Sequence, residues 1–319
     1  MKTTKTTFTI VSALASVILL TSCGSNTNKT QETKASSTKN QVTMTYDQQR
    51  SQENTMSVLW YQKAAETKAL YLQGYNVATD RLKEILQTPS DKPYSIVLDL
   101  DETVLDNSPY QVQNVKDGTA FNPKDWDVWV KKAAAKAVPG AKDFLQYADQ
   151  NGVQIYYISD RTTSQVDDTI KNLEKEGIPV QGRDHLMFLE DGVKSKEGRR
   201  QTVQEKTNLV LLFGDNLVDF ADFSKTSEAY RDKKLDELQK EFGEKFIIFP
   251  NPMYGSWESA VYQGKKLDAK GQQKNASKPC KVLINKTNIL VRFFLTRIFV
   301  LFVKTLQGFE AFFCLSLGV

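Results

Sequence analysis

Five short apolar runs, separated by stretches long enough to hold a helix, most constrain the fold of this chain. The runs occupy residues 95–100, 153–158, 186–189, 208–213 and 245–249. Apolar runs of this length are typical of strands that are buried on both faces of a sheet. Strands that alternate with helices form parallel sheets, so we predict an α/β fold with a parallel sheet at its centre.

Residues 46–88, before the first strand, have the pattern of a helix that ends at Pro89. Leu59, Leu70, Tyr71 and Tyr75 recur there at helix-like spacings, and we expect the aromatic stripe to pack in the core rather than to bind a ligand. The insert between the first two strands, residues 109–150, forms a helical accessory region. Further helices are predicted over residues 163–176 and 227–242, and another opens at the basic stretch 194–200.

The first 22 residues have the features of a signal peptide. Lys2 and Lys5 precede an apolar run, residues 10–20, that is too short to span a membrane comfortably. The sequence Leu-Thr-Ser-Cys-Gly that follows resembles a bacterial lipobox, in which Cys23 would become the lipidated N-terminus. An ordinary signal peptide with an incidental cysteine is the alternative. Residues 23–45 are polar and of low complexity, so we expect a flexible tether. The protein would then lie outside the cytoplasm, anchored by its lipid to the bacterial cell membrane or outer membrane.

The composition changes again in a C-terminal tail, residues 274–319, which holds seven of the 17 phenylalanines. Its apolar stretch, residues 289–304, contains Arg292 and Arg297 and therefore makes a poor transmembrane helix. Three interpretations remain open. The tail is a second membrane anchor, an amphipathic surface helix, or an aberrant extension without a designed role.

Charge and residue usage exclude several functions for the middle of the chain. Residues 23–268 carry 32 basic and 37 acidic side chains, which gives no reason to expect nucleic-acid binding. Both cysteines other than Cys23, at positions 280 and 314, lie in the tail, so the body has neither a disulfide framework nor a cysteine nucleophile. With His185 as the one histidine, a histidine nucleophile is also unsupported. Neither a P-loop nor a Gly-x-Ser-x-Gly elbow is present.

Polar residues follow three of the predicted strands at the point where each ends. The groups are Asp99, Asp101 and Thr103; Ser159, Asp160 and Arg161; and Asp215, Asn216 and Asp219. The carboxyl ends of parallel strands lie along one edge of the sheet, where ligands bind. Carboxylates that meet there suit Mg²⁺, and a nearby lysine and serine hydroxyl suit a phosphate. These groups together have the parts that phosphoryl transfer requires.

The motifs LDLDETVLDNSPY, SDR, SKEGRR, GDNLVDF and PNPMYGSWE, in this order, resemble those of the haloacid-dehalogenase superfamily. More narrowly, they are similar to its class C non-specific acid phosphatases, which are bacterial surface lipoproteins. The resemblance implies a Rossmann-like sheet and an acid phosphatase domain over residues 46–273. It also implies that the function is Mg²⁺-dependent hydrolysis of phosphomonoesters.

By this resemblance, Asp99 is the nucleophile and becomes an aspartyl-phosphate, and Asp101 is the general acid and base. The resemblance places Mg²⁺ on Asp99, the backbone carbonyl of Asp101 and Asp215, with support from Asp219. The phosphoryl group would be bound by Thr103, Ser159 and Lys196. Lys196 is preferred to Lys194 because it stands three residues before Arg199, which is the family's spacing.

Two aromatic residues, Trp126 and Tyr254, align with those that stack on the substrate's ring in the family. The resemblance therefore implies nucleoside monophosphates, as in a 5'-nucleotidase, and aryl phosphates as substrates. One position departs from the family, because Asp160 stands where an asparagine is usual. A further carboxylate beside a phosphate is repulsive, so we hypothesise that Asp160 points away or is protonated at acid pH.

Several alternatives to this function stay open. An enzyme with narrow nucleotide preference, or a phosphotransferase, would use the same residues. A surface lipoprotein that binds haem or a host ligand is the alternative from another class, and a damaged copy that does not fold is a third. As partners we expect a small phosphomonoester and a membrane reached through the lipid, without nucleic acid, and we allow for a homodimer.

Overall fold

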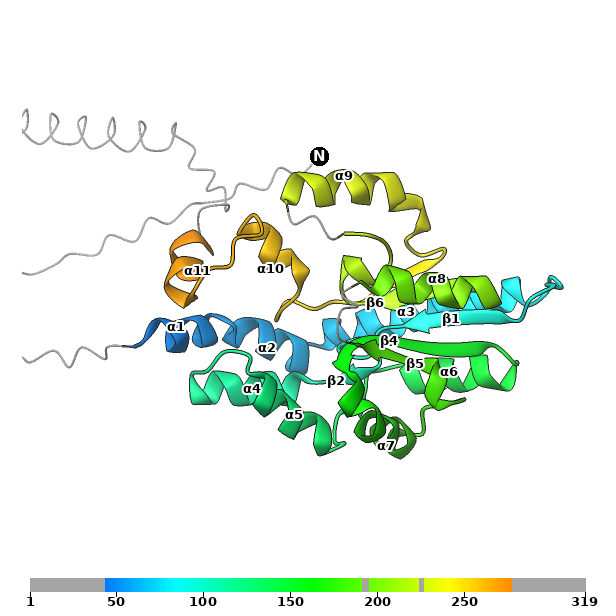
Figure 1. The fold of residues 1–319 in the computed structure, drawn as a ribbon, viewed down its shortest axis with the longest axis horizontal. Coiled ribbons are helices and arrows are strands. Elements are labelled where there is room, and N and C mark those ends of the chain that lie inside the picture. The colour runs from blue at the N-terminus through cyan, green and yellow to red at the C-terminus, as the bar shows by residue number, and fades with distance from the viewer. Residues whose placement is uncertain (1–43, 191–194, 224–226, 277–319) are drawn as a thin grey trace, which may run out of the picture. The chain divides into compact units, whose positions relative to one another are not determined.

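The five predicted strands form one sheet in the computed structural model, which describes residues 44–190, 195–223 and 227–276. The order is β5-β4-β1-β6-β7, and every neighbouring pair is parallel. The strands are β1 (Tyr94–Leu98), β4 (Gln154–Thr162), β5 (Leu186–Leu189), β6 (Asn208–Gly214) and β7 (Phe246–Ile248). The α/β class with a parallel sheet, predicted from the apolar runs, is therefore confirmed (Figure 1).

The central strand β1 is buried on both faces, which explains the apolar run of residues 96–98 within it. Ile96 and Leu98 belong to the larger hydrophobic cluster, and Val97 belongs to a smaller one on the opposite face. Successive side chains of a strand point to opposite faces, so each apolar residue of β1 has its own layer to pack against.

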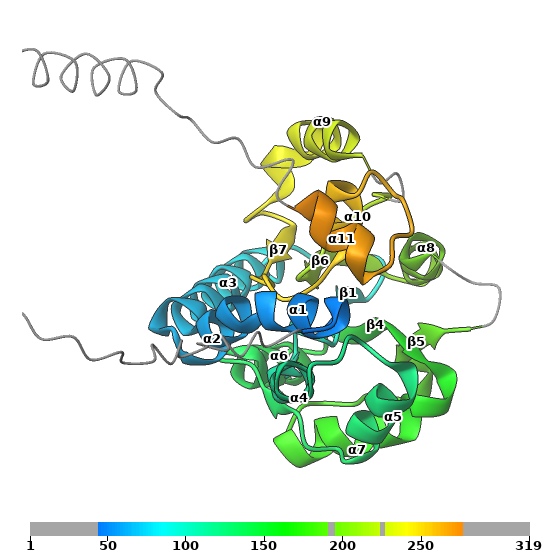
Figure 2. The same cartoon turned by 90° about the vertical axis from the view of Figure 1, so that its left-hand side faces the viewer.

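Helices cover both faces of this sheet. Helices α3 (Ala65–Ile85) and α6 (Ala141–Gln150) contact each other and pack over the larger cluster. Helix α8 (Lys196–Lys206) packs on β4 and β6 from the other side, where Val203 enters the smaller cluster (Figure 2). Helix α7 (Val166–Glu176) ends as predicted at Gly177, whose φ of 74° is left-handed.

The predicted N-terminal helix is three helices rather than one. They are α1 (Tyr46–Glu53), α2 (Thr55–Lys63) and α3, which begins at Ala65. The predicted aromatic stripe does lie in the core, because Tyr71 and Tyr75 are each 1% exposed. Leu59 and Leu70, which share its helical spacing, are instead 46% and 42% exposed.

The accessory region lies beyond the carboxyl end of the sheet. It contains α4 (Ser108–Asp117) and α5 (Pro123–Lys131), and α4 packs on α1 and α2 (Figure 1). A two-stranded antiparallel ribbon, β2 (Leu105–Asp106) and β3 (Lys136–Ala137), pairs the segment before α4 with the segment after α5. The pattern of the sequence did not predict this ribbon, since two-residue strands carry no periodicity.

The last described helices are α9 (Glu228–Leu238), α10 (Ser256–Val261) and α11 (Ala269–Ala276), and α11 packs on α1. Single 3₁₀ turns are η1 (Thr163–Gln165), η2 (Arg183–His185), η3 (Leu217–Asp219) and η4 (Gln239–Glu241). The predicted signal peptide, Cys23, most of the tether and the tail from residue 277 lie outside the described residues. Among the residues that are described, none of the helices is both long and apolar enough to cross a membrane.

Candidate active site

The chain turns sharply after β1, and helix α3 holds this turn, residues 99–103, in place. Glu102 has a left-handed backbone with φ of 57°, which is uncommon for a residue with a side chain. Tyr71 donates its hydroxyl to the Glu102 carbonyl at 2.5 Å, and Tyr75 donates to the Thr103 carbonyl at 2.7 Å. The buried aromatic stripe thus fixes the backbone that carries the two predicted catalytic aspartates.

Three of the predicted metal ligands meet at the edge of the sheet. Carboxylate oxygens of Asp99, Asp215 and Asp219 lie within 4.8 Å of one another. Lys196, the first residue of α8, lies against the same group, and its Nζ is 2.6 Å from Oδ1 of Asp99 and 2.6 Å from Oδ1 of Asp219. The structure therefore brings together residues from the ends of two strands, one 3₁₀ turn and one helix.

Local contacts aim the two later aspartates of this group. Oδ2 of Asp219 accepts the backbone N–H of Asn216 at 3.0 Å within turn η3, and Asn251 donates to Oδ2 of Asp215 at 2.8 Å. Gly214 makes room for them, because a Cβ there would lie 2.3 Å from the Asp219 side chain. A glycine is needed at the end of β6 for this close approach.

Burial and mutual repulsion dominate the electrostatics of the group. Burial, with repulsion from Asp219, raises the pKa of Asp215 to about 7. Burial also raises the pKa of Asp99 well above its ordinary value, although Lys196 opposes the shift. Burial by itself would lower the pKa of Lys196, but Asp219 and Asp99 raise it above its ordinary value. The lysine therefore stays charged, while the carboxylates attract further positive charge.

The residues present fit a divalent metal ion. The three carboxylates carry one lysine among their ion-pair partners in the described residues, so two negative charges remain uncompensated. The donors are all oxygen, which suits a hard cation such as Mg²⁺. The side chain of Asp101 does not belong to this group. Its predicted contribution through the backbone carbonyl stays a prediction.

Asp101 is instead held by an arginine and an amide. Arg161 donates from Nη2 to Oδ1 at 2.7 Å and from Nε at 3.1 Å, and Nδ2 of Asn107 reaches the same oxygen at 2.8 Å. The Asp101 side chain is 18% exposed and lines the pocket described below. It lies at the mouth of the site, with one oxygen engaged by donors.

Two predicted phosphate-binding hydroxyls lie deeper. Ser159 is fully buried, and its Oγ accepts the backbone N–H of Arg161 at 3.1 Å. Thr103 is also fully buried, and its Oγ1 is one of the buried polar atoms that lack a hydrogen-bond partner within the described chain. Neither residue is among those that line the pocket, and their roles toward a phosphate stay predictions.

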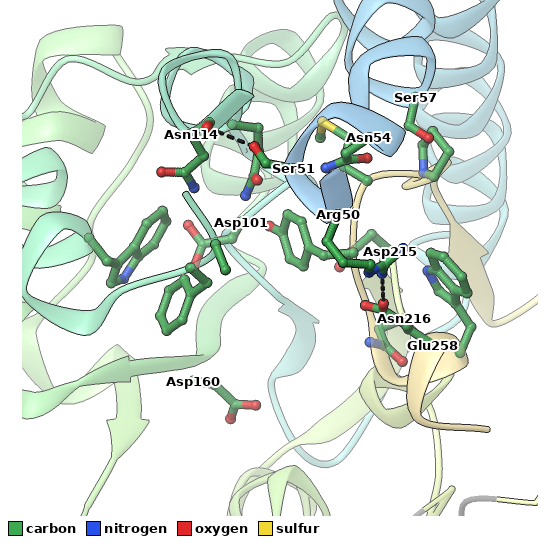
Figure 3. Close-up of a pocket in the computed structure, with 18 of the residues that line it drawn as sticks. Arg50, Ser51, Asn54, Ser57, Asp101, Asn114, Asp160, Asp215, Asn216 and Glu258 are labelled. Atoms are coloured by element: carbon green, nitrogen blue, oxygen red, sulfur yellow. Dashed lines mark hydrogen bonds and ion pairs between the residues drawn. The ribbon is translucent and has the colours of Figure 1, made fainter. Parts of the chain in front are cut away.

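Asp160, where the family has asparagine, is paired away from the carboxylates. Its Oδ1 accepts from Nη2 of Arg199 at 2.9 Å, and its side chain is 60% exposed. Figure 3 shows it well apart from Asp101 and Asp215, at the lower end of the pocket. This arrangement agrees with the hypothesis that Asp160 points away from a bound phosphate.

A pocket of about 630 Å³ opens over the carboxylates and is large enough for a substrate with a ring. Both predicted stacking residues, Trp126 of α5 and Tyr254 after β7, line it. Trp126 is held edge-on to Tyr110 with centroids 5.2 Å apart, and the guanidinium of Arg161 lies 5.6 Å from its ring centroid. The ring of Trp126 therefore has fixed partners on this side of the pocket.

Sequence reasoning did not assign roles to several residues of this site. Arg161 lines the pocket and Asn107 is buried beside Asp101, and both lie inside quoted motifs, which was the signal that could have identified them. Arg50 carried no such signal, because helix α1 reaches the pocket only through tertiary packing. In Figure 3 it lies beside Glu258, its ion-pair partner from α10.

Comparison with known proteins adds a family match and two similar structures. The family model described as "HAD superfamily, subfamily IIIB (Acid phosphatase)" matches residues 15–257. The structure of the class C acid phosphatase from Bacillus anthracis is 46% identical in sequence, with a TM-score of 0.71, and the match covers 73% of this chain and 99% of that chain. A second structure of that enzyme, with tungstate bound, gives 48% identity and a TM-score of 0.70 over 73% and 98% of the two chains.

A curated plant protein is also similar over part of its length. Acid phosphatase 1 of Solanum lycopersicum is 26% identical over 163 residues, which are 50% of this chain. The match spans 57% of the tomato protein.

Proposed function

Since the chain belongs to the acid phosphatases of the HAD superfamily, subfamily IIIB, we propose that it is a Mg²⁺-dependent phosphomonoesterase that acts through an aspartyl-phosphate. The observation that carries this proposal is the group of Asp99, Asp215 and Asp219 around Lys196, with Asp101 two residues beyond the first. It supplies a nucleophile, a charge clamp, a cation site and an acid in one pocket.

In the first half-reaction, Asp99 attacks phosphorus. One carboxylate oxygen of Asp99 forms a bond to phosphorus as the bond from phosphorus to the substrate's ester oxygen breaks. Asp101 donates a proton to that leaving oxygen, so the products are an alcohol and the aspartyl-phosphate. Lys196 already contacts Oδ1 of Asp99, and its ammonium lies where it neutralises charge on the transferred group.

In the second half-reaction, water attacks the phosphorus of the aspartyl-phosphate. Asp101, now ionised, accepts a proton from the water while the bond between phosphorus and the Asp99 oxygen breaks. The products are inorganic phosphate, the free Asp99 carboxylate and the protonated Asp101, so the enzyme returns to its starting state. The same carboxyl serves as acid and then as base.

Asp99, Asp215 and Asp219 would hold the Mg²⁺. When bound, the ion neutralises charge on the phosphoryl oxygens and offsets the repulsion among the carboxylates. Lys196 alone leaves that repulsion incompletely balanced, which supports the assignment of a divalent rather than a monovalent ion.

Nucleoside monophosphates and aryl phosphates are the substrates that the pocket fits best. Trp126 and Tyr254 line the same pocket as the carboxylates, and base or phenyl rings stack on aromatic side chains of this kind. The similar enzyme from Bacillus anthracis is called a class C acid phosphatase, and the use of the same class of substrate here is inferred from that likeness.

For the cellular setting we propose a lipid anchor at Cys23, outside the cytoplasm. The support is the signal-like segment and the lipobox-like sequence before the polar tether. Metabolic labelling with a palmitate analogue checks it: Cys23→Ala should lose both the label and membrane association, while Cys280→Ala should keep them.

Hydrolysis assays test the enzymatic proposal. We expect the purified protein to hydrolyse p-nitrophenyl phosphate and a nucleoside monophosphate with Mg²⁺ and to lose this activity with a chelator. Asp99→Asn should lower turnover by about 10³-fold or more, because the nucleophile is removed. Asp80→Asn, a matched change at an exposed position on α3, should leave turnover unchanged. Full activity of Asp99→Asn would contradict the proposal.

A further inference from the structure

Two residues, Asn107 and Arg161, donate hydrogen bonds to one oxygen of Asp101, and a third residue, Trp129, orients Asn107. Asn107 is fully buried, and each of its polar side-chain atoms has a partner. Its Oδ1 accepts the indole N–H of Trp129 at 2.8 Å, and its Nδ2 donates to Oδ1 of Asp101 at 2.8 Å. Its backbone N–H donates to Oε1 of Glu102 at 2.8 Å, so the residue cannot shift without breaking contacts on three sides.

Two contacts set which way the Asn107 amide faces: Oδ1 accepts from the indole of Trp129, and Nδ2 donates to the Leu105 carbonyl at 3.2 Å. An indole nitrogen is a donor only, so it requires the amide oxygen rather than the amide nitrogen. With the oxygen committed to Trp129, the NH₂ group faces Asp101. Without the indole N–H, the amide could rotate and set its oxygen against a carboxylate oxygen, which would be repulsive.

Arg161 completes the hold on the same oxygen. Its side chain is 2% exposed, and Nη2 and Nε lie 2.7 and 3.1 Å from Oδ1 of Asp101. Nη1 donates to Oγ1 of Thr169 at 2.9 Å, which fixes the plane of the guanidinium. Oδ1 of Asp101 thus has three donors, whereas Oδ2 has one shared contact, from Nε at 3.3 Å.

We propose that Trp129, Asn107 and Arg161 are positioning residues that fix Oδ1 of Asp101 and leave Oδ2 to face the leaving-group oxygen. The inference rests on the proposed function and deepens it. Three donors on Oδ1 leave no lone pair there for a proton, so the transferred proton belongs to Oδ2. In the first half-reaction it moves from Oδ2 to the ester oxygen as the bond to phosphorus breaks.

The identity of the leaving group separates this role from a merely structural one. An alkyl alcohol, such as a nucleoside 5'-hydroxyl, leaves poorly unless it is protonated, whereas p-nitrophenolate leaves readily without a proton. Misalignment of Asp101 should therefore slow alkyl phosphates more than aryl phosphates. A general loss of folded protein would slow both by the same factor.

The test compares kcat/KM for a nucleoside monophosphate and for p-nitrophenyl phosphate in Trp129→Phe, which removes the indole N–H and keeps an aromatic ring. We expect the nucleotide value to fall about tenfold or more and the aryl value to change by no more than about twofold. Trp60→Phe on α2, the same change outside the pocket, should leave the ratio of the two values unchanged. Equal losses on both substrates, or no loss on either, would overturn the proposal.

A second variant covers the outcome in which Trp129→Phe does not fold. Thr169→Val keeps the shape of the side chain and removes the acceptor of Nη1 on the far side of Arg161, and it should give the same selective loss. An unchanged ratio in a folded Thr169→Val protein would then refute the positioning role. Failure of the proposed function is separate, since it would appear as wild-type protein that hydrolyses neither substrate, and this inference would fall with it.

Discussion

Mg²⁺ affinity should depend steeply on pH, because a proton and the metal ion compete for Asp215. The pKa of this carboxyl is raised to about 7 in the metal-free protein by burial and by Asp219. At pH 5 the proton must be displaced at a cost of about two pKa units, so the apparent affinity should be about 100-fold weaker than at pH 8. At pH 8 the group is ionised and the competition is almost absent.

Calorimetric titration with MgCl₂ in buffers of different ionisation enthalpy measures both consequences. We expect at least one proton released per bound ion near pH 5, and fewer at pH 8, where Asp215 no longer contributes one. The same rise in the pKa of Asp215 affects the stability of the metal-free protein in the opposite direction, since stability falls as pH rises. Between the ordinary pKa of 3.8 and about 7, the folded state binds more protons than the unfolded state. The metal-free protein should therefore lose stability as pH rises through this window.

Mg²⁺ should offset that loss, so the rise in melting temperature on adding the ion should be larger at pH 7 than at pH 5. An affinity that stays constant between pH 5 and 8, with no proton release at the lower pH, would refute the reasoning. It would mean that Asp215 is ionised throughout or does not hold the ion.

Three further substitutions follow from the geometry. Gly214→Ala should abolish stabilisation by Mg²⁺, because the new Cβ would lie 2.3 Å from Asp219 and must displace that ligand. Gly198→Ala in α8, where a Cβ meets nothing within 4 Å, should raise the free energy of unfolding by about 0.5–1 kcal/mol. Denaturation with and without Mg²⁺ distinguishes them, and normal metal stabilisation of Gly214→Ala would contradict the steric argument. Asp160→Asn should leave the pH profile of kcat/KM unchanged and cost no more than about 1 kcal/mol of stability, because Asp160, unlike its buried partner Arg199, is largely exposed and the amide keeps an oxygen that can accept from Arg199. A shifted profile would show that Asp160 tunes activity.

The sheet was predictable because its strands are buried on both faces. Residues 96–98 are apolar because each face of β1 meets its own hydrophobic cluster, and the helix-length gaps left a parallel order as the simplest topology. The edge that collects Asp99, Asp215 and Asp219 follows from that topology alone. The residues that meet at this edge of the sheet could therefore be predicted from the sequence alone.

Contacts made between distant segments could not be predicted in this way. Arg50 reaches the pocket because α1 packs on α4 and α11, which no local pattern encodes. Trp129 packs against the larger hydrophobic cluster, and its indole N–H helps to orient Asn107, a contact between residues 22 positions apart that no local pattern encodes. The exposure of Leu59 has the same origin, since helical spacing shows which residues share a face but not what covers it.

The most direct test of the account is the fate of the phosphoryl group in Asp101→Asn. With p-nitrophenyl phosphate the first half-reaction needs no proton donor, while the second loses its base. We therefore predict a burst of p-nitrophenol and a phosphoryl group that mass spectrometry of rapidly quenched protein locates on Asp99. A burst without a phosphoryl group on Asp99, or with the group on another residue, would contradict the aspartyl-phosphate mechanism.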